Sequence, residues 1–126
     1  GESDNVIVLR LAEMYLIKAE ALNEQSYEAD GDAFVALNTI RERAGLTELT
    51  SAEVATQDDF RLAVEKERRL ELAFEGHRMI DLRRTGRAAD VLPDIGTFVS
   101  ANQMLLPIPQ SEVDLNTAIT ANNPGY

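Results

Sequence analysis

Three glutamates stand at every fourth position in the middle of the chain. Glu67, Glu71 and Glu75 belong to the stretch ERRLELAFEGHRMIDLRRTGR. Residues four apart lie on one side of an α-helix, so their carboxylates would form a row. Two carboxylates about one helical turn apart are also near the separation used by retaining glycosidases. The spacing therefore admits two interpretations, an active site or a structural cluster of ion pairs.

The position of this row on a helical wheel favours the structural interpretation. With Phe60 at zero and about 100° per residue, Glu67 falls at about −20°, Glu71 at about +20° and Glu75 at the edge of the same arc. That arc is otherwise apolar and holds Phe60, Ala63, Val64, Leu70 and Phe74. A carboxylate under an apolar face needs a cation, because its desolvation is otherwise costly. A catalytic pair would instead flank an open cleft.

Arginine is the cation that suits such a row, because its planar fork binds carboxylates at two points and keeps its charge. Arginines stand on the first helix, on the inner edge of the second, and just after Gly76. We therefore predict a buried ionic network that fixes the register of the helices. Its predicted members are Arg10, Arg41, Glu67, Glu71, Glu75 and Arg78.

Other candidate sites have simpler interpretations. His77 is the single histidine and is accompanied by no HExxH pattern, so we interpret it as a packed or capping residue and not a metal ligand. An anion site at Asp81 with the arginines of 83–87 is weaker than a salt-bridged surface. The sequence has no cysteine, phosphate-binding loop or nucleophile elbow. We predict no catalytic, cofactor-binding or metal-binding residue, and no enzyme activity.

Length and charge exclude several classes of protein. A chain of 126 residues suits one domain, 1–126. The net charge is −10, and eight of the twelve Lys and Arg residues lie between positions 61 and 87 among acids that offset them. Nucleic acid is therefore not an expected partner. No apolar run approaches 18 residues and the start GESDNVIV does not resemble a signal peptide, so no membrane span is predicted.

Apolar spacing predicts an antiparallel helical hairpin in the first half of the chain. The first helix, about 8–24, has apolar residues on so much of its circumference that we expect it to pack on more than one side. The second helix spans about 32–44, with Asp30 or Asp32 as its cap and Gly45 ending it in a left-handed conformation. The pair is typical of a tetratricopeptide unit. The stripe of the first helix is Val8, Ala12, Tyr15, Ala19 and Leu22.

The second half begins with two more helices and ends irregularly. Thr56 and Asp59 resemble a capping box ahead of a third helix at about 57–75, and a fourth spans about 77–85. Four prolines make the segment 91–126 an extended arm, in which SEVD forms one helical turn and PIPQSEVDLN covers an apolar face. The predicted fold is all-α, a tetratricopeptide-like helical hairpin plus further helices, with an irregular proline-containing C-terminal arm.

Four motifs in this order resemble the SusD/RagB family of outer-membrane nutrient-binding lipoproteins. They are RLAEMYLIKAEALNE, LNTIRERAGL, ERRLELAFEGHRMIDLRRTG, and LLPIPQSEVDLN with a terminal NPGY. The resemblance covers nearly the whole chain. It implies that the 126 residues form the C-terminal portion of a larger protein built on tetratricopeptide-like helix pairs.

The resemblance also implies a function for the larger protein. Such a protein would be lipid-anchored and surface-exposed at the cell outer membrane. It would bind glycans or other nutrients and work with a SusC-type TonB-dependent transporter. The matching motifs belong to the scaffold, so no ligand-binding residue is carried over to this chain. The alternative is a free-standing tetratricopeptide-like module that binds a partner peptide in the groove of its hairpins.

Overall fold

The computed structural model describes residues 9–93 and 100–126. These residues contain helices and no strand, which confirms the predicted all-α, tetratricopeptide-like class. Internal contacts divide the chain into two compact units, residues 1–78 and 79–126. The expected single domain over 1–126 stays a prediction. None of the helices in the described ranges combines the length and the apolar composition that a membrane span requires.

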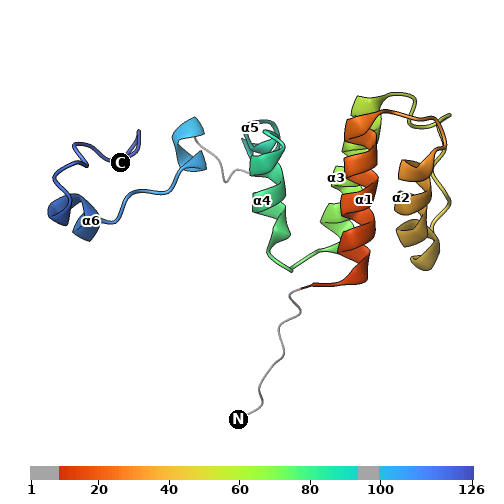
Figure 1. The fold of residues 1–126 in the computed structure, drawn as a ribbon, viewed down its shortest axis with the longest axis horizontal. Coiled ribbons are helices and arrows are strands. Elements are labelled where there is room, and N and C mark those ends of the chain that lie inside the picture. The colour runs from red at the N-terminus through yellow and green to blue at the C-terminus, as the bar shows by residue number, and fades with distance from the viewer. Residues whose placement is uncertain (1–8, 94–99) are drawn as a thin grey trace, which may run out of the picture. The chain divides into compact units, whose positions relative to one another are not determined.

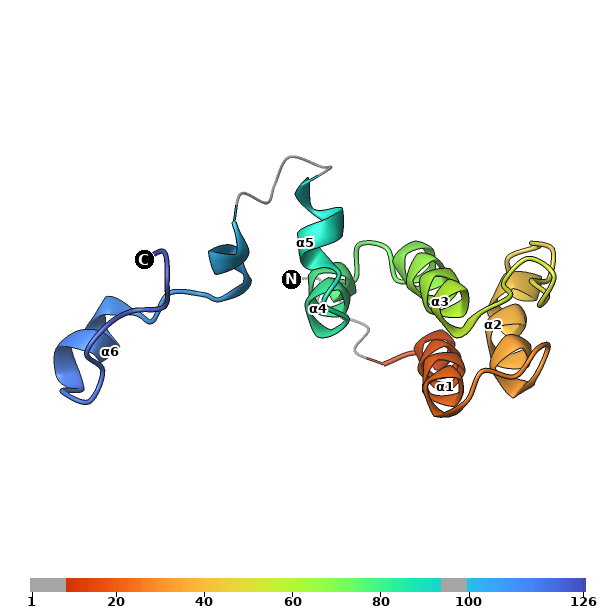
Figure 2. The ribbon, with the colours of Figure 1, turned by 90° about the horizontal axis from the view of Figure 1, so that it is seen from above.

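The first unit is built on three helices that lie side by side (Figures 1 and 2). They are α1 (Leu11–Gln25), α2 (Asp32–Arg43) and α3 (Gln57–Glu71). Helix α1 packs against both of the others, as expected from its wide apolar surface. It begins three residues later than the predicted 8–24, because Arg10 has an extended backbone. Position 8 of the predicted stripe lies outside the described residues.

Small side chains allow the helices of this unit to approach one another closely. Four alanines of α1 and α2 are at most 6% exposed, and large residues fill the space between them. The rings of Phe34 and Phe60 lie 4.6 Å apart and join α2 to α3. Close packing of this kind supplies most of the stability of a small domain. The principal buried residues are Ala12, Leu16, Ala19, Ala33, Phe34, Ala36, Leu37, Ile40, Phe60 and Val64.

The ends of α2 confirm one expectation and correct another. Gly45 has φ 71°, and its N–H donates to the carbonyl of Glu42 while Leu46 donates to Arg41. This is the Schellman pattern of a helix that ends at a left-handed residue. The start is different, because the cap residue is Gly31 and no side chain caps the helix. The carboxylate of Asp30 instead accepts hydrogen bonds from the N–H and hydroxyl of Ser51.

Helix α3 starts as predicted but ends early. The hydroxyl of Thr56 accepts from the N–H of Asp59, which confirms the predicted cap. The helix ends at Glu71 and not at position 75, and residues 72–76 form a turn. Phe74 has φ 66° there and is fully exposed, so the apolar spacing that suggested continued burial did not extend past the helix end. Gly76, with φ 84°, completes the turn.

Hydrogen bonds from side chains hold the connector between α2 and α3 against α2 and against the loop that precedes it. The amide of Asn38 donates to the carbonyl of Leu49 and accepts from its N–H, both at 2.9 Å. The hydroxyl of Tyr27 donates to the carbonyl of Val54 at 2.6 Å. Side-chain amides that bond both backbone groups of one residue replace a missing strand partner.

The second half of the chain contains short helices. Helix α4 spans His77–Arg84, against the predicted 77–85, and α5 spans Ala88–Val91. A 3₁₀ turn, η2, spans Ala101–Met104, and α6 spans Gln110–Leu115, which contains the predicted SEVD turn. The arm is thus irregular, as expected. That it covers an apolar face of the helices stays a prediction. A small core of this unit comprises Leu82, Ala88 and Leu92, with Val91 and Met104 against it.

The C-terminal residues clasp the proline-rich segment LLPIP. The amide of Asn122 accepts from the N–H of Ile108 at 2.8 Å and donates to its carbonyl at 3.1 Å. Asn123 donates to the carbonyl of Leu106, and the hydroxyl of Tyr126 to that of Leu105. Prolines cannot donate, so this segment depends on side chains to pair its backbone. The NPGY tail therefore has a local structural explanation.

Candidate functional site

The acidic row lies where α3 faces α1 and α2. Glu67 is 4% exposed and is buried among the apolar residues of α3. The side chain of Glu71 is 10% exposed, and that of Glu75 is 30% exposed. Glu75 lies in the turn after the helix, so the regular four-residue spacing does not hold for it in space.

The buried carboxylate of Glu67 is matched by Arg41 of α2. The Nη1 of Arg41 lies 3.1 Å from the Oε2 of Glu67. Its Nε and Nη2 donate to the carbonyl of Thr47 at 3.0 and 2.8 Å. One guanidinium therefore joins the end of α2, the connector and the middle of α3, and the fork geometry of arginine makes this three-way contact feasible.

The carboxylate of Glu71 is shared between two arginines. The Nη2 of Arg10 lies 3.0 Å from its Oε1, and Arg43 contacts its other oxygen. Arg10 also donates to the backbone carbonyl of Glu71. The Nε of the same arginine lies 3.0 Å from the Oε2 of Glu75. Arg10 therefore links the start of α1 to the end of α3 and to the turn that follows it.

Arg78 was predicted to belong to the ionic network, but it lies away from the acidic row. Its Nη1 is 3.1 Å from the Oε1 of Glu65, and no ion pair among the described residues joins it to the acidic row. The reason is the early end of α3, since the turn at 72–76 redirects the chain before Arg78 is reached. Of the six predicted residues, the structure brings together Arg10 with Glu71 and Glu75, and Arg41 with Glu67.

Three further side chains, those of Glu13, Arg68 and His77, meet on the other flank of α3, and sequence reasoning did not predict this contact. Arg68 is 5% exposed, and its Nη2 lies 3.6 Å from the Oε1 of Glu13. The Nδ1 of His77 lies 3.6 Å from the same oxygen. On a helical wheel, Glu13 falls on the side of α1 opposite its apolar stripe. Because α1 has two neighbours in different directions, that side faces α3. The sequence feature that could have indicated this contact is the wide apolar surface of α1, which implies neighbours on two sides.

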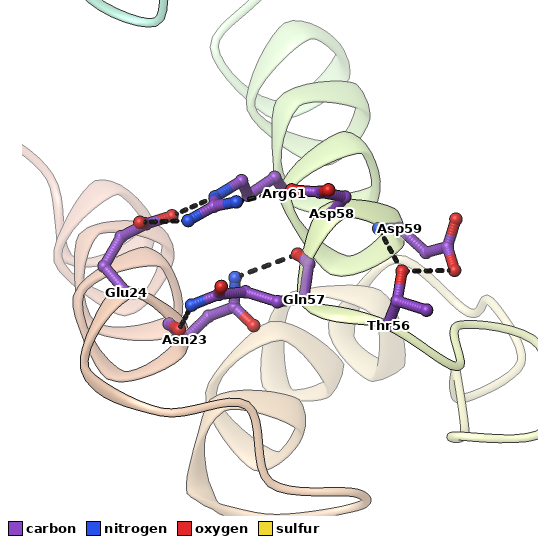
Figure 3. Close-up of polar contacts among 7 residues, drawn as sticks. All are labelled: Asn23, Glu24, Thr56, Gln57, Asp58, Asp59 and Arg61. Carbon is purple, nitrogen blue, oxygen red and sulfur yellow. Dashed lines mark hydrogen bonds and ion pairs between the residues drawn. The ribbon is translucent and has the colours of Figure 1, made fainter.

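A second polar cluster joins the C-terminal end of α1 to the N-terminal end of α3 (Figure 3). The side chains of Asn23 and Gln57 each donate to the backbone carbonyl of the other residue. Asn23 is 1% exposed, so this reciprocal pair is shielded from water. Hydrogen bonds in such a site are costly to lose because each leaves a buried polar group unpaired. The pair fixes how far α3 slides along α1.

The same cluster contains a two-point ion pair. Two nitrogens of Arg61 lie 2.6 Å from the two carboxylate oxygens of Glu24, and Arg61 also contacts Asp58 (Figure 3). The hydrogen bonds from Arg61 lower the pKa of the Glu24 carboxyl below its usual value. The hydrogen bonds that Arg61 donates to Glu24 and Asp58 raise the pKa of Arg61. Both partners are therefore charged at neutral pH.

These contacts support an architectural role for the acidic row. A general acid, nucleophile or metal ligand must present a free oxygen to a substrate or ion. Here Glu67 and Glu71 present their oxygens to guanidinium groups of neighbouring helices. Within the described ranges 9–93 and 100–126, no group of His, Cys, Asp or Glu residues is placed to hold a metal ion.

A groove of about 290 Å³ lies apart from the ionic network. It runs between the outer face of α2 and the connector, with Phe34 and Leu49 beside the polar Asn38, Glu42 and Glu48. The amide of Asn38 is already engaged with the backbone of Leu49. The groove is at the lower limit of size for small-molecule sites.

Residues 1–126 match the sequence model of the SusD family over their whole length. The chain belongs to the SusD family. Two SusD-like proteins of Formosa agariphila, P2 and P25, are 38% and 40% identical to this SusD-family chain over 134 and 138 residues. These matches cover 98% and 100% of the chain and 26% of each relative. The starch-binding protein SusD of Bacteroides thetaiotaomicron is 34% identical over 130 residues, 97% of the chain and 22% of that protein.

Solved structures of SusD-like proteins have the same fold. A laminarin-binding SusD-like protein is 41% identical, with a TM-score of 0.72 over 96% of this chain and 23% of its own. A SusD-like protein from Bacteroides fragilis is 32% identical, with a TM-score of 0.78 over 97% of this chain and 26% of its own. The SusD-family chain thus spans about a quarter of the length of the relatives it matches.

Proposed function

We propose that this chain is a scaffold segment of a nutrient-binding protein that takes up glycans at the outer membrane. The observation that supports this most directly is the match to the SusD family over residues 1–126, together with 41% identity to a laminarin-binding relative. The relatives are about four times as long, so the ligand site of the complete protein belongs to the proposal and not to the described residues.

The contacts within the segment fit a scaffold better than a binding site. Arg10 pairs with Glu71 and Arg41 with Glu67, and the rings of Phe34 and Phe60 pack in the core. Phe74, in the turn after α3, is exposed, but it stands apart from those paired groups in the turn. Sugar-binding sites commonly use exposed aromatic rings together with free polar groups. The proposed role of Arg10, Arg41, Glu67, Glu71 and Glu75 is therefore to hold the helices in register.

The rest of the proposal concerns the complete protein. It is anchored at the cell surface by lipid, carries no catalytic activity, and delivers its ligand to a SusC-type TonB-dependent transporter. Such a pair works by capture followed by transfer, so the binding protein needs affinity and a docking surface and no chemistry.

The test uses the complete protein encoded by the gene. Affinity electrophoresis or titration calorimetry with laminarin, starch and a panel of other glycans should reveal saturable binding to one class, with no release of reducing ends. Co-purification from outer membranes should recover a TonB-dependent transporter encoded beside it. Turnover of a glycan, or binding to no glycan or peptide nutrient, would contradict the proposal.

A further inference from the structure

The loop between α1 and α2 contains the pair Asp30–Gly31. Gly31 is the one glycine of the chain that follows an Asp or an Asn. A glycine leaves its own backbone nitrogen unhindered, because it has no side chain. In an Asp–Gly pair this nitrogen can attack the side chain of the aspartate. The ring that results opens again to aspartate or to isoaspartate.

The geometry of the turn requires these two residue types. Asp30 has φ 54°, a left-handed conformation that Asp and Asn tolerate better than most residues. A Cβ on Gly31 would lie 2.8 Å from the Cβ of Glu28 and 3.2 Å from its carbonyl oxygen, so a side chain there would displace the backbone. The reactive pair is therefore a consequence of the turn that leads into α2.

The folded loop holds both reacting groups in other contacts. The two carboxylate oxygens of Asp30 accept hydrogen bonds from the N–H and the hydroxyl of Ser51, each at 2.7 Å. The N–H of Gly31 donates to the carbonyl of Glu28 at 3.1 Å. These contacts must break before the nitrogen of Gly31 can bond to the Cγ of Asp30. Asp30 is exposed, so water can reach the ring once it forms.

Ser51 also keeps the carboxyl group in its unreactive form. Ring closure expels the carboxyl OH as water, so it requires the protonated carboxyl group. The hydrogen bonds from the hydroxyl and the N–H of Ser51 lower the pKa of the Asp30 carboxyl. The carboxylate that predominates at neutral pH is therefore the form that does not close the ring.

We propose that Asp30–Gly31 is a site of isoaspartate formation and that Ser51 restrains the reaction. The nitrogen of Gly31 gives up its proton and bonds to the Cγ of Asp30, and the carboxyl OH leaves with that proton as water. The product is a succinimide ring. Water then breaks one of the two C–N bonds of the ring. Cleavage at Cγ restores aspartate, and cleavage at the backbone carbonyl carbon of Asp30 gives isoaspartate.

Isoaspartate at position 30 removes a link within the first unit. The main chain then runs through the Cβ and Cγ of this residue and gains one methylene group, and the free carboxylate moves to the Cα. Asp30 belongs to the loop before α2, and Ser51 belongs to the connector between α2 and α3. Their two hydrogen bonds join these segments. The modification therefore releases the connector from the start of α2.

The test follows the reaction by mass spectrometry. The complete protein, as the gene encodes it, is incubated in water labelled with heavy oxygen, both folded and in denaturant. Each opening of the ring inserts one heavy oxygen atom. Trypsin releases residues 19–41 as one peptide, and electron-transfer fragmentation locates the isoaspartate within it. Asp32, which precedes an alanine in the same peptide, is the internal control.

Two variants separate the effect of Ser51 from that of the local sequence. Ser51→Ala removes the hydroxyl donor, and Ser51→Thr retains it. Folded Ser51→Ala should form isoaspartate at Asp30 about five-fold faster than the folded parent, since one hydrogen bond is lost. Ser51→Thr should react like the parent. In denaturant all three proteins should react alike, because Ser51 is then no longer in contact with Asp30.

The unsubstituted protein gives a test that does not depend on the folding of a variant. Isoaspartate and label should accumulate at Asp30 at least about ten-fold faster in denaturant than in the folded state, where three hydrogen bonds must break first. Equal rates in the two states would overturn the proposal. It would also be overturned by isoaspartate that forms at Asp32 in place of Asp30, or by Ser51→Ala that is folded by circular dichroism and reacts at the rate of the parent.

Discussion

Arg41 of α2 and Glu67 of α3 form an ion pair of 3.1 Å in which the carboxylate side chain is 5% exposed and the guanidinium side chain 16% exposed. Twenty-six positions separate the two residues, and the same arginine also binds the carbonyl of Thr47. Breaking one side of such a pair leaves a buried charge without its partner, which is more costly than the pair is stabilising. We therefore predict that these two residues control the orientation of α2 against α3.

Two replacements of Glu71 should distinguish how much its charge and its hydrogen bonding each contribute to stability. Glu71→Ala leaves Arg10 and Arg43 without their shared acceptor and should lower the free energy of unfolding by about 1–2 kcal/mol. Glu71→Gln keeps one acceptor oxygen and should cost less. Urea titration followed by circular dichroism measures both. Two variants that unfold at the same urea concentration as the parent would show that the pairs have no structural importance.

The ion pair of Glu24 should make a small part of the stability depend on pH. The folded pKa of Glu24 is lowered by Arg61, so its contribution is complete above the unfolded pKa of about 4.5 and is lost as pH falls through the lower folded value. Glu24→Gln should therefore lower Tm slightly at pH 7, and the difference from the parent should shrink in acid.

The matched control for this titration is Glu48→Gln, at an exposed position of the connector. Its Tm should follow that of the parent at every pH. Thermal unfolding at intervals between pH 7 and pH 3 gives the comparison. A difference for Glu24→Gln that grows toward low pH would have the wrong sign for the structure.

Gly45 offers a test of backbone conformation without any change in packing. A Cβ at this position would meet no atom within 4 Å, so only its φ of 71° opposes a side chain. Gly45→Ala should cost about 1 kcal/mol, and Gly45→Asn less, because asparagine tolerates the left-handed region. Chemical denaturation of both variants checks the order. Equal stability of the two would argue against the Schellman ending of α2.

Asn122 should protect one backbone amide of the proline-rich segment. Asn122→Ala removes the acceptor of the Ile108 N–H and should speed its hydrogen exchange about five-fold, since one hydrogen bond contributes near 1 kcal/mol. Asn122→Asp keeps an acceptor oxygen and loses the donor to the Ile108 carbonyl, so protection should be partly retained. Exchange followed by NMR distinguishes the two, and the amide of Leu37, in the core of the first unit, serves as the control. Unchanged exchange at Ile108 in both variants would rule out the clasp.

The sequence predicted what depends on local spacing. The positions of α1, α2 and the start of α3 followed from apolar periodicity, from Thr56 as a cap and from Gly45 as a terminator. The direction of Glu67 also followed from periodicity, because a helical wheel needs no knowledge of the neighbouring helix.

Features set by tertiary packing could not be predicted in this way. The end of α3 at Glu71 moved Glu75 and Phe74 into a turn and Arg78 to Glu65. The pairing of Arg68 with Glu13 depends on α1 having neighbours on two sides. The first error arises because apolar periodicity does not show where a helix ends, and the second because a one-dimensional pattern shows which residues share a face but not which faces meet.

The central claim is that the ion pair between Arg41 and Glu67 stabilises the arrangement of α2 and α3. A double-mutant cycle on these two residues tests it most directly. Arg41→Ala, Glu67→Ala and the double variant are compared with the parent by equilibrium unfolding. If the pair stabilises the fold, its coupling free energy should be about 1–3 kcal/mol. The double variant should then lose less stability than the sum of the losses of the two single variants. A coupling free energy indistinguishable from zero would contradict it.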